Sequence, residues 1–433
     1  MPKPPNILIL YPDQWRGDAL GFLGTSAART PNLDRLAREG RYFPNAFVAN
    51  PVCTPSRGSF QTGRYPHATG VTANDVRLPI GETGFAEAFT AAGYRTGYIG
   101  KWHLDGDPRP GFVPPERRHG WKWWAGFNRG HRYYDGVYFR DSDQSIPAPG
   151  FEPDHQTDLA IEFLETSAHE DSRPFCLMLA WGPPHTPLDP PERRRNSYRP
   201  VDMPLPASVP TGLSEQARVE RARYFGLVSA LDDNVGRLLV TLDRLRLAAS
   251  TLVMFTSDHG DSLGEHGLFR KTIPYDEATR VPFLARWPGQ IPAASADPTF
   301  IRSVDVGPTL TGVCRLAMGP SVQGHNLSAA LLGGATITPD SAYMEGNFNR
   351  TSAGQLDNRA IPEHWRALRT PDHLLVTNPG GAVRLLFDLR ADPLAVHNVA
   401  GLPVAQEAQR TLLARLRAEA AVLEDPAPLG DVG

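Results

Sequence analysis

Cysteine, long apolar runs and net charge are all scarce in this sequence. Only three cysteines occur among 433 residues, namely Cys53, Cys176 and Cys314, so a disulfide framework is not expected and a reducing compartment is favoured. No apolar run is long enough to span a bilayer, and residues 1–5 are too short to be a signal peptide. These absences predict a soluble cytoplasmic protein that does not enter a membrane.

The charged residues do not indicate a polyanionic partner. The chain has 44 basic and 47 acidic residues, which gives a net charge of -3. Such a balance produces no long-range field that would attract nucleic acid or an anionic membrane, so any anion must be bound by local groups. We find no internal repeat and no low-complexity tract, and the sequence does not indicate an oligomeric state.

Short, continuous apolar runs indicate strands that are buried on both faces. They occur at residues 7–11, 94–99, 174–181 and 251–256, with helical patterns between them. This alternation predicts an α/β fold with a mostly parallel central sheet sandwiched by helices. We expect the alternation to continue through a strand at residues 281–287.

Polar residues that can bind a metal or an anion follow each of these runs. They are Asp13, Lys101, His103, His185, Asp258 and His259. The carboxyl ends of parallel strands meet at one edge of a sheet, where ligands bind, and the Asp-His pair offers oxygen and nitrogen ligands for a divalent metal. Each residue alone is commonly a capping aspartate, a solvated lysine or a loop histidine, but their recurrence predicts one shared site.

The stretch at residues 51–58 predicts an anion-binding helix terminus around a cysteine. Pro55 suits the first turn of a helix, so we expect a loop that ends at Cys53 and a short helix that runs to Phe60. Backbone N–H groups and the helix dipole favour an anion beside Cys53, and Arg57 adds a fixed charge one turn later. The alternative is a buried cysteine that only packs.

Residues 106–150 have little periodicity and many aromatic side chains, including Trp121 and Trp124. A long irregular segment in a compact domain is usually functional or disordered, and so many aromatic residues argue against disorder. One interpretation is a wall of a substrate pocket, with Arg129, His131 and Arg132 as polar contacts. The other is a packed structural flap, and the sequence does not decide between them.

The pattern changes after about residue 335. Residues 365–377 and 382–389 flank an Asn-Pro-Gly-Gly turn, which is typical of an antiparallel hairpin, and residues 404–422 predict a helix. We therefore expect a large α/β domain over residues 1–335 and a small C-terminal α+β subdomain over residues 336–433.

The run Cys53-Thr54-Pro55-Ser56-Arg57 resembles the signature of the sulfatase family, within the alkaline phosphatase superfamily. Further motifs match in family order at residues 6–13, 30–34, 53–63, 100–103, 183–185, 257–260 and 271. The resemblance therefore covers nearly the whole chain and implies an alkaline-phosphatase-like fold. It also implies that Cys53 is oxidised after synthesis to formylglycine by a maturation enzyme, and that the hydrate of this aldehyde is the nucleophile.

The resemblance implies a role for each residue that matches a family motif. The implied metal ligands are Asp13, Gln14, the modified Cys53, Asp258 and His259. The implied catalytic residues are Cys53, Arg57, Lys101, His103, His185 and Lys271. Arg57, Lys101, His185 and Lys271 would hold the anion, His185 or Lys271 would protonate the leaving oxygen, and His103 would take the proton that lets sulfate leave a covalent sulfo-enzyme intermediate.

Two positions depart from the commonest family pattern. Gln14 stands where most sulfatases have a second aspartate, and His259 stands where many have asparagine. Both features look more like the phosphonate monoester hydrolase and choline sulfatase branches. An oxygen-rich site suits Ca²⁺, which we expect, while an imidazole in place of an amide favours Mn²⁺ as the alternative.

The sequence thus predicts a hydrolase of sulfate monoesters, either aryl sulfates or sulfated saccharides. One alternative is a phosphonate monoester or phosphodiester hydrolase that uses the same site. An alternative of another class is a non-catalytic protein that binds a metal and a glycan and keeps Cys53 as a thiol. The alcohol half of the substrate is not specified, because the aromatic residues suit an aryl ring and a sugar face equally.

Overall fold

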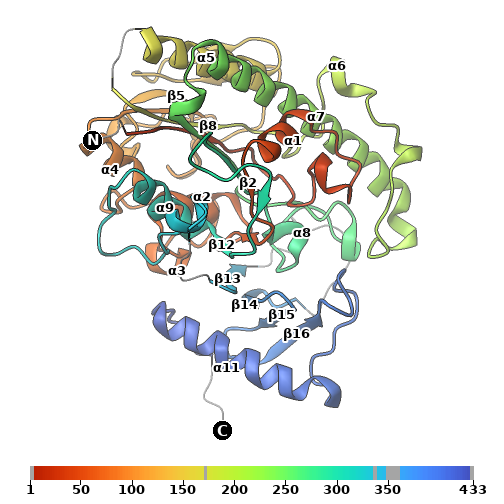
Figure 1. The fold of residues 1–433 in the computed structure, drawn as a ribbon. Helices are drawn as coiled ribbons and strands as arrows, with labels where there is room; N and C mark the ends of the chain where they lie inside the picture. The colour runs from red at the N-terminus through yellow and green to blue at the C-terminus, as the bar shows by residue number, and fades with distance from the viewer. Residues whose placement is uncertain (1–3, 170–172, 335–338, 348–360, 430–433) are drawn as a thin grey trace.

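The protein is built on an eight-stranded sheet with helices on both faces (Figure 1). This computed structural model describes residues 4–169, 173–334, 339–347 and 361–429. The strand order of the main sheet is β11-β2-β10-β9-β1-β8-β4-β5. Its strands are β1 (Asn6–Leu10), β2 (Arg41–Tyr42), β4 (Arg95–Lys101), β5 (Trp123–Phe127), β8 (Phe175–Ala180), β9 (Thr251–Phe255), β10 (Leu284–Arg286) and β11 (Ser295–Ala296).

The centre of this sheet is parallel, as the continuous apolar runs predict. Strand β1 pairs in parallel with β8 on one side and with β9 on the other, and β4 pairs in parallel with both β8 and β5. Ile7 and Ile9 pack into the core on one face, whereas Leu8 and Leu10 pack into the core on the other face. Both faces of β1 are therefore buried, which explains why its sequence does not alternate with polar residues.

Two groups of helices cover the two faces of the sheet. One layer holds α1 (Pro31–Arg38), α5 (Glu152–His169) and α7 (Ser214–Arg244), and the other holds α2 (Cys53–Thr62), α4 (Phe85–Ala91) and α9 (Val306–Val313). The shorter helices are α3 (Pro66–Thr69), α6 (Glu192–Arg195), α8 (Asp276–Thr279) and α10 (Ser328–Leu331). The layered α/β architecture expected from the sequence is confirmed.

The expected continuation of the parallel alternation through residues 281–287 is wrong. Strand β10 pairs antiparallel with β9, so that Leu284 lies opposite Phe255. A parallel return would need a crossover of a dozen or more residues, usually a helix. Between these strands the chain forms only the four-residue helix α8 and a short 3-10 turn at Glu265–Gly267. The chain therefore turns back along β9 instead of crossing the sheet.

The aromatic segment at residues 106–150 contributes both strands and buried side chains to the fold. It contributes β5 to the edge of the main sheet and a small hairpin of β6 (Gly136–Tyr138) and β7 (Ile146–Ala148). Trp121 and Trp124 are buried in the core beside Tyr98. A packed flap therefore describes these two tryptophans, and they do not form a pocket wall.

A second sheet lies at the C-terminal end of the chain, below the main body in Figure 1. It is antiparallel and contains β13 (Ala342–Asn347), β14 (His364–Arg369), β15 (His373–Thr377) and β16 (Val383–Asp388), with α11 (Gln406–Val422) packed against it. The predicted hairpin is present between β15 and β16. Residues 365–377, expected as one strand, form two, because the chain turns between β14 and β15. The boundary predicted at residue 335 lies outside the described residues.

Short strand pairs also join distant segments of the chain. Strand β3 (Ala46–Phe47) pairs in parallel with β12 (Ile301–Arg302). This pairing fixes the segment that leads into Cys53 against the chain that leads into α9.

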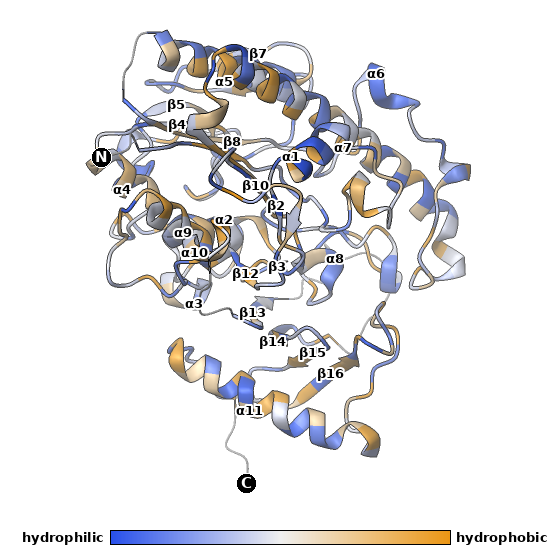
Figure 2. Ribbon diagram, in the orientation of Figure 1, coloured by the Kyte–Doolittle hydropathy of each residue, from blue (hydrophilic) through white to orange (hydrophobic). Residues whose placement is uncertain are grey.

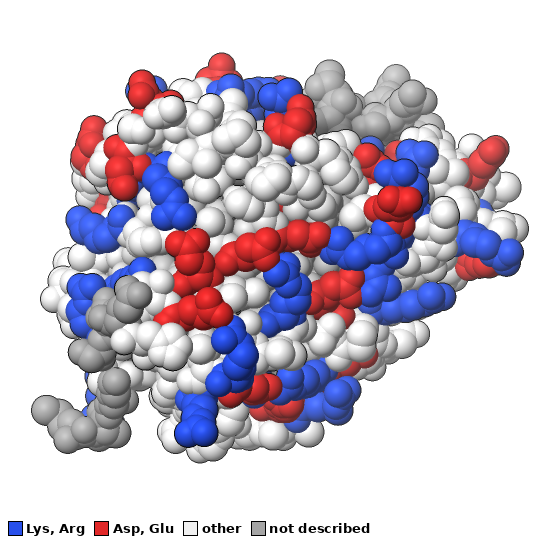
Figure 3. All heavy atoms as spheres, turned by 90° about the horizontal axis from the view of Figure 1, so that it is seen from above, with Lys and Arg blue, Asp and Glu red and all other residues white. Residues whose placement is uncertain are grey.

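The surface mixes charges of both signs, and the long helices have one apolar side. Figure 2 shows α5, α7 and α11 coloured both orange and blue along their length. In Figure 3 basic and acidic side chains lie next to one another. Ion pairs such as that of Arg193 with Asp154, at 2.7 Å, join residues of opposite charge. Among the described helices, none combines the length and the apolar composition needed to cross a bilayer.

Candidate active site

Neighbouring strands bring polar residues to the same edge of the sheet. The N–H of Asp13 donates to the carbonyl of Trp181 at 3.1 Å, and the N–H of Thr256 donates to the carbonyl of Leu10 at 3.1 Å. The ladders of β1 with β8 and of β1 with β9 thus continue beyond the strands. They hold Asp13 and Asp258 in fixed positions at the carboxyl edge, as the sequence predicts.

Cys53 is the first residue of α2, which confirms the predicted helix start. Val52 before it is extended, with φ -138° and ψ 139°, and its carbonyl accepts the N–H of Ser56 at 2.9 Å. Pro55 occupies the first turn, where the helix needs no N–H from it. The helix runs two residues past Phe60 and ends before Gly63, whose φ of 68° suits a residue without a side chain.

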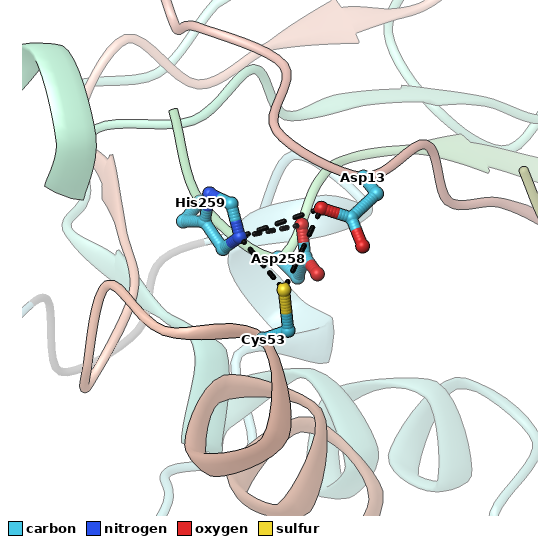
Figure 4. Close-up of side chains that lie close together, drawn as sticks. All are labelled: Asp13, Cys53, Asp258 and His259. Carbon is cyan, nitrogen blue, oxygen red and sulfur yellow. Dashed lines mark hydrogen bonds and ion pairs between the residues drawn. The ribbon is translucent and has the colours of Figure 1, made fainter. Parts of the chain in front are cut away.

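Cys53, Asp13, Asp258 and His259 converge on one point (Figure 4). Their ligand atoms all lie within 4.8 Å of one another, and all four residues are buried. Nε2 of His259 lies 3.3 Å from the sulfur of Cys53 and 3.4 Å from Oδ1 of Asp13. The sulfur lies 3.7 Å from the same carboxylate oxygen. Two carboxylates, an imidazole and the side chain at position 53 thus face a common centre.

The imidazole of His259 is oriented by the backbone. Its Nδ1 lies 2.9 Å from the carbonyl oxygen of Gly260, so Nδ1 carries the hydrogen and donates it. Nε2 then presents its lone pair to the cluster in the neutral ring, as a metal ligand requires.

Gln14 adds an oxygen that has no partner. Its side-chain nitrogen donates to Asp261 at 2.6 Å, and its backbone N–H donates to Oδ1 of Asp258 at 3.0 Å. Its Oε1 is buried and makes no hydrogen bond within the part of the chain that the structure describes. The backbone of Gln14 is left-handed, with φ 69°. Because buried polar atoms are normally satisfied, this orphaned oxygen fits a cation ligand.

Three cationic side chains enclose the cluster. Arg57 donates to Oδ2 of Asp258 at 3.0 Å and to Oδ2 of Asp13 at 3.1 Å. Nζ of Lys101 lies 2.5 Å from Oδ2 of Asp13 and 3.4 Å from the sulfur of Cys53. Nζ of Lys271 lies 2.8 Å from the same sulfur and 2.9 Å from Nε2 of His259. The chain has only four lysines, so two of them lie at this site.

These charges shift the protonation of Cys53. Burial raises the pKa of the thiol, but Lys101, Lys271 and His259 outweigh burial and hold the pKa well below its usual range. Position 53 therefore favours an anion, which is the electrostatic property that a nucleophile or a bound oxyanion needs.

Asp13 is also held as an anion. Burial and the nearby Cys53 raise the pKa of its carboxyl group, whereas Lys101, His185 and Arg57 lower it, and the net pKa lies well below its usual range. A permanently ionised carboxylate at this position suits a cation ligand.

Two further predicted residues contact the side chain of Cys53. The imidazoles of His103 and His185 both interact with this side chain. Nδ1 of His185 lies 2.7 Å from the carbonyl oxygen of Thr186, so it carries the hydrogen and leaves Nε2 for the site. Every residue predicted for the metal or catalytic set thus lies at this edge of the sheet.

The aromatic segment contributes one imidazole to the site. The ring of His131 stacks on that of His185, with centroids 3.7 Å apart and planes 3° apart. Nε2 of His131 lies 3.1 Å from Nζ of Lys101, and Tyr133 donates to the carbonyl of His185 at 2.6 Å. Burial, followed by the charges of His185 and Lys101, holds the pKa of His131 well below its usual range.

The two arginines predicted beside His131 lie elsewhere. Arg129 pairs with Asp75 and Asp107, and the exposed Arg132 pairs with Asp135 at 2.9 Å. Neither contacts the metal cluster, although Asp75 in turn contacts His103.

Sequence reasoning missed Asp75, Asp261 and Tyr133, which hold His103, Gln14 and His185. Asp261 could have been found, because it follows the Asp-His pair after a buried strand. No local signal marks Asp75, which reaches the site through the fold of a loop.

Comparison with known proteins supplies a family match over most of the chain. The model of the family described as Sulfatase matches residues 5–315. A second model, described as N-sulphoglucosamine sulphohydrolase, C-terminal, matches residues 264–421. The first match spans the central sheet and every residue of the cluster.

Individual relatives and structures agree with this match. An ulvan-active sulfatase of Formosa agariphila is 34% identical over 98% of this chain and 82% of its own length. An N-acetylglucosamine-6-O-sulfatase of Bacteroides thetaiotaomicron is 25% identical over 95% of this chain and 85% of its own length. The crystal structure of a phosphonate monoester hydrolase of Agrobacterium radiobacter superimposes with a TM-score of 0.78 and 24% identity, covering 97% of this chain and 96% of the other.

Proposed function

Because the chain belongs to the sulfatase family of sulfuric ester hydrolases, we propose that it hydrolyses its sulfate ester with a metal-bound formylglycine formed from Cys53. Its activity is the hydrolysis of sulfate esters, which favours an enzyme over a non-catalytic binding protein. The observation that carries the proposal is the convergence of two carboxylates, an imidazole and two lysines on the side chain of residue 53, with Arg57 bound to both carboxylates.

The residues present fit a divalent cation. Asp13, Asp258 and His259 offer ligand atoms around one point, and the unpartnered Oε1 of Gln14 offers another oxygen. We propose Ca²⁺ as the resident ion, because most of these ligands are oxygens. The imidazole of His259 makes Mn²⁺ the alternative. When bound, the ion would polarise the oxygen carried by residue 53 and neutralise charge on the sulfate.

Position 53 also fits the modified residue. The hydrate of formylglycine supplies a hydroxyl group that can attack sulfur. The residues around it would bind the sulfate group. Arg57, Lys101 and Lys271 lie where they can bind its non-bridging oxygens. Such preorganised donors stabilise charge that develops in the transition state. The modification requires a formylglycine-generating maturation enzyme, which we propose as a partner.

Three side chains are placed to transfer protons. His185 or Lys271 is placed to protonate the leaving oxygen, since both contact the side chain of residue 53. His103 contacts the same side chain and is placed to accept a proton there. The backbone carbonyl of His185 accepts a hydrogen bond from the hydroxyl group of Tyr133, which fixes the main chain beside the imidazole of His185.

For the substrate we propose a sulfated saccharide or an aryl sulfate. One relative is an ulvan-active sulfatase and another is an N-acetylglucosamine-6-O-sulfatase, which supports this substrate class. We place the enzyme in the cytoplasm, where three free cysteines would stay reduced.

The decisive experiment combines peptide mass spectrometry of residue 53 with hydrolysis of an aryl sulfate. Protein from a host that contains the maturation enzyme should carry the aldehyde, and its activity should scale with the converted fraction. Cys53→Ala should abolish activity, whereas Cys314→Ala, at a half-buried cysteine distant from the cluster in sequence, should keep it. Full activity in a protein whose Cys53 is entirely a thiol would refute the proposal.

A second candidate is a phosphonate monoester or phosphodiester hydrolase on the same site. It is favoured by Gln14 and His259 and by the similar fold of the phosphonate monoester hydrolase. Parallel assays of an aryl sulfate, phenyl phosphonate and a phosphodiester distinguish the candidates. The sulfate ester should have the highest kcat/KM, and a preference for either phosphorus substrate by orders of magnitude would favour the second candidate.

A further inference from the structure

His103 lies between the side chain of Cys53 and the carboxylate of Asp75. Its Nε2 is 3.3 Å from Oδ1 of Asp75, and the imidazole also interacts with the side chain of Cys53. His103 is only 3% exposed, whereas Asp75 stands at the rim with 32% of its side chain accessible. A carboxylate, an imidazole and the reacting residue are therefore arranged in series.

This arrangement determines the tautomer of the ring. An ionised carboxylate can only accept hydrogen bonds, so Nε2 of His103 must carry a hydrogen. In the neutral ring Nδ1 then has the lone pair, and within the described residues this buried atom has no hydrogen-bond partner. Nδ1 is thus the atom at which the ring can accept a proton.

The loop that carries Asp75 is anchored to the nucleophile helix. The side-chain oxygen of Asn74 accepts the N–H of Thr54, the second residue of α2, at 3.1 Å. The backbone of Asp75 is left-handed, with φ 67°, which turns its carboxylate toward His103. The orientation of the ring is therefore set from the same helix that presents residue 53.

Two arginines of the aromatic segment contact the carboxylate of Asp75. Arg129 donates to the same Oδ1 of Asp75, and Arg109 lies 3.8 Å from Oδ2. The hydrogen bond from His103 holds the pKa of Asp75 below its usual value, against the effect of burial and with help from Arg129. Asp75 thus stays an anion, which is the form that can orient the ring.

We propose that Asp75 is a positioning residue for catalysis, which holds His103 in the tautomer that accepts a proton at Nδ1. This inference rests on the proposed role of His103 as the base. When Nδ1 takes up the proton, the ring becomes an imidazolium, and the Asp75 carboxylate accepts the hydrogen bond from its Nε2–H. The proton later leaves Nδ1 for solvent, so the ring and the carboxylate return to their initial states.

The test uses Asp75→Asn with Asp107→Asn as its matched control. Asparagine has the same shape as aspartate and tolerates a left-handed backbone, so the loop should keep its conformation. Its amide can donate to Nε2 and so favour the other tautomer. Asp107 pairs with Arg129 at 3.2 Å and with Arg109 at 3.4 Å, and 79% of its side chain is exposed. Within the described residues it makes no hydrogen bond or ion pair with His103.

The first measurement is independent of activity. Long-range ¹⁵N–¹H NMR of the histidine rings, in protein whose Cys53 is still a thiol, reports which nitrogen of His103 carries the hydrogen; His103→Gln assigns the signal. We expect Nε2–H in the wild type and in Asp107→Asn, and a shift toward Nδ1–H in Asp75→Asn. An unchanged Nε2–H signal in Asp75→Asn would overturn the inference.

The second measurement separates positioning from general damage. In the converted enzyme, Asp75→Asn should lower kcat by about tenfold or more while an initial burst of released alcohol remains, because the proton uptake assigned to His103 follows alcohol release. A purely structural role would reduce the burst as well, and Asp107→Asn should match the wild type. If the wild type does not hydrolyse sulfate esters, the proposed function fails. If it does and the two variants behave alike, only the role of Asp75 fails.

Discussion

The ammonium nitrogen of Lys271 lies 2.8 Å from the sulfur of Cys53, although 218 residues separate the two in the sequence. The residues on both sides of Lys271 have left-handed backbones, with φ 74° at Arg270 and 76° at Thr272. Such a conformation is strained for a β-branched residue like threonine. The N–H of Thr272 donates to the carbonyl of Pro51 at 3.3 Å. This hydrogen bond joins the left-handed residues around Lys271 to the segment before Cys53.

Replacement of this lysine should impair catalysis far more than folding. Lys271→Met keeps the length of the side chain but removes the charge beside residue 53. We expect kcat/KM to fall by about a hundredfold, the usual effect of losing one preorganised donor to a developing anion. Lys122→Met, at an exposed lysine, is the control and should be unchanged. Equal activity of the two variants would remove Lys271 from the catalytic set.

Chelation should lower both activity and thermal stability. A cation that binds only the folded state stabilises it by mass action, so its removal must lower the melting temperature. Dialysis against a chelator followed by readdition of Ca²⁺ or Mn²⁺ identifies the preferred ion. Stability and activity that do not respond to chelation would argue against a metal at Asp13 and Asp258.

The preference between the two ions should depend on the imidazole. His259→Asn replaces a nitrogen ligand by an amide oxygen, so it should shift the preference toward Ca²⁺. Reactivation of the chelated variant by each ion, compared with the wild type, measures the shift. An identical ratio of Ca²⁺ to Mn²⁺ activity in both proteins would exclude His259 as the residue that sets the preference.

Gly260 should not tolerate even a methyl group. A Cβ atom at this position would lie 2.0 Å from the backbone oxygen of Glu277, a distance that no rotamer change can relieve. Gly260→Ala should therefore displace the Asp258-His259 turn and reduce metal affinity and melting temperature together. Gly212→Ala, where a Cβ atom would meet nothing within 4 Å, is the matched control. Calorimetry and metal titration of the two variants test this expectation.

Glu152 should make the protein less stable as pH rises. Burial, followed by the charge of Asp135, raises the pKa of its carboxyl group from 4.5 to about 8. The folded state thus favours the protonated form, so its contribution to stability is fully present below pH 4.5 and is lost as pH rises through about 8. Glu152→Gln should remove this loss.

The size of the effect follows from the shift in pKa. At pH 8 the Glu152→Gln variant should be more stable than the wild type by on the order of 4 kcal/mol, and near pH 4 the two should be equal. Denaturant unfolding across this pH range measures the difference. Glu162→Gln, at an exposed residue of the same helix, is the control. A constant difference between Glu152→Gln and the wild type at all pH values would contradict the expectation.

The sequence predicts the parts of this fold in which local pattern and burial agree. Apolar runs such as that of β1 mark strands covered on both faces, and the polar residues after them mark one edge of the sheet. The direction of β10 could not be read in the same way, because it depends on the absence of a crossover helix and not on the composition of the strand.

Contacts between side chains that are distant in the sequence could not be predicted either. The sequence around Trp121 and Trp124 would look the same whether they lined a pocket or filled the core. Only their packing beside β4 shows that they belong to the core. Asp75 reaches His103 across 28 residues, through a loop that no periodic pattern describes. Among the residues that orient the site, only Asp261 thus has a local signal in the sequence, whereas Asp75 has none.

Because β8, β1 and β9 are parallel, the residues of the candidate site follow the strands at one margin of the sheet, and the chain enters the strands at the other. Helix α7 returns the chain to the opposite margin of the sheet, where the exposed turn at Ala248–Ser250 precedes β9. A circularly permuted enzyme opened at this turn, with its original ends joined by a linker, would interrupt none of the segments that reach the carboxyl margin. New termini should be tolerated there, far better than on the loops that follow the strands.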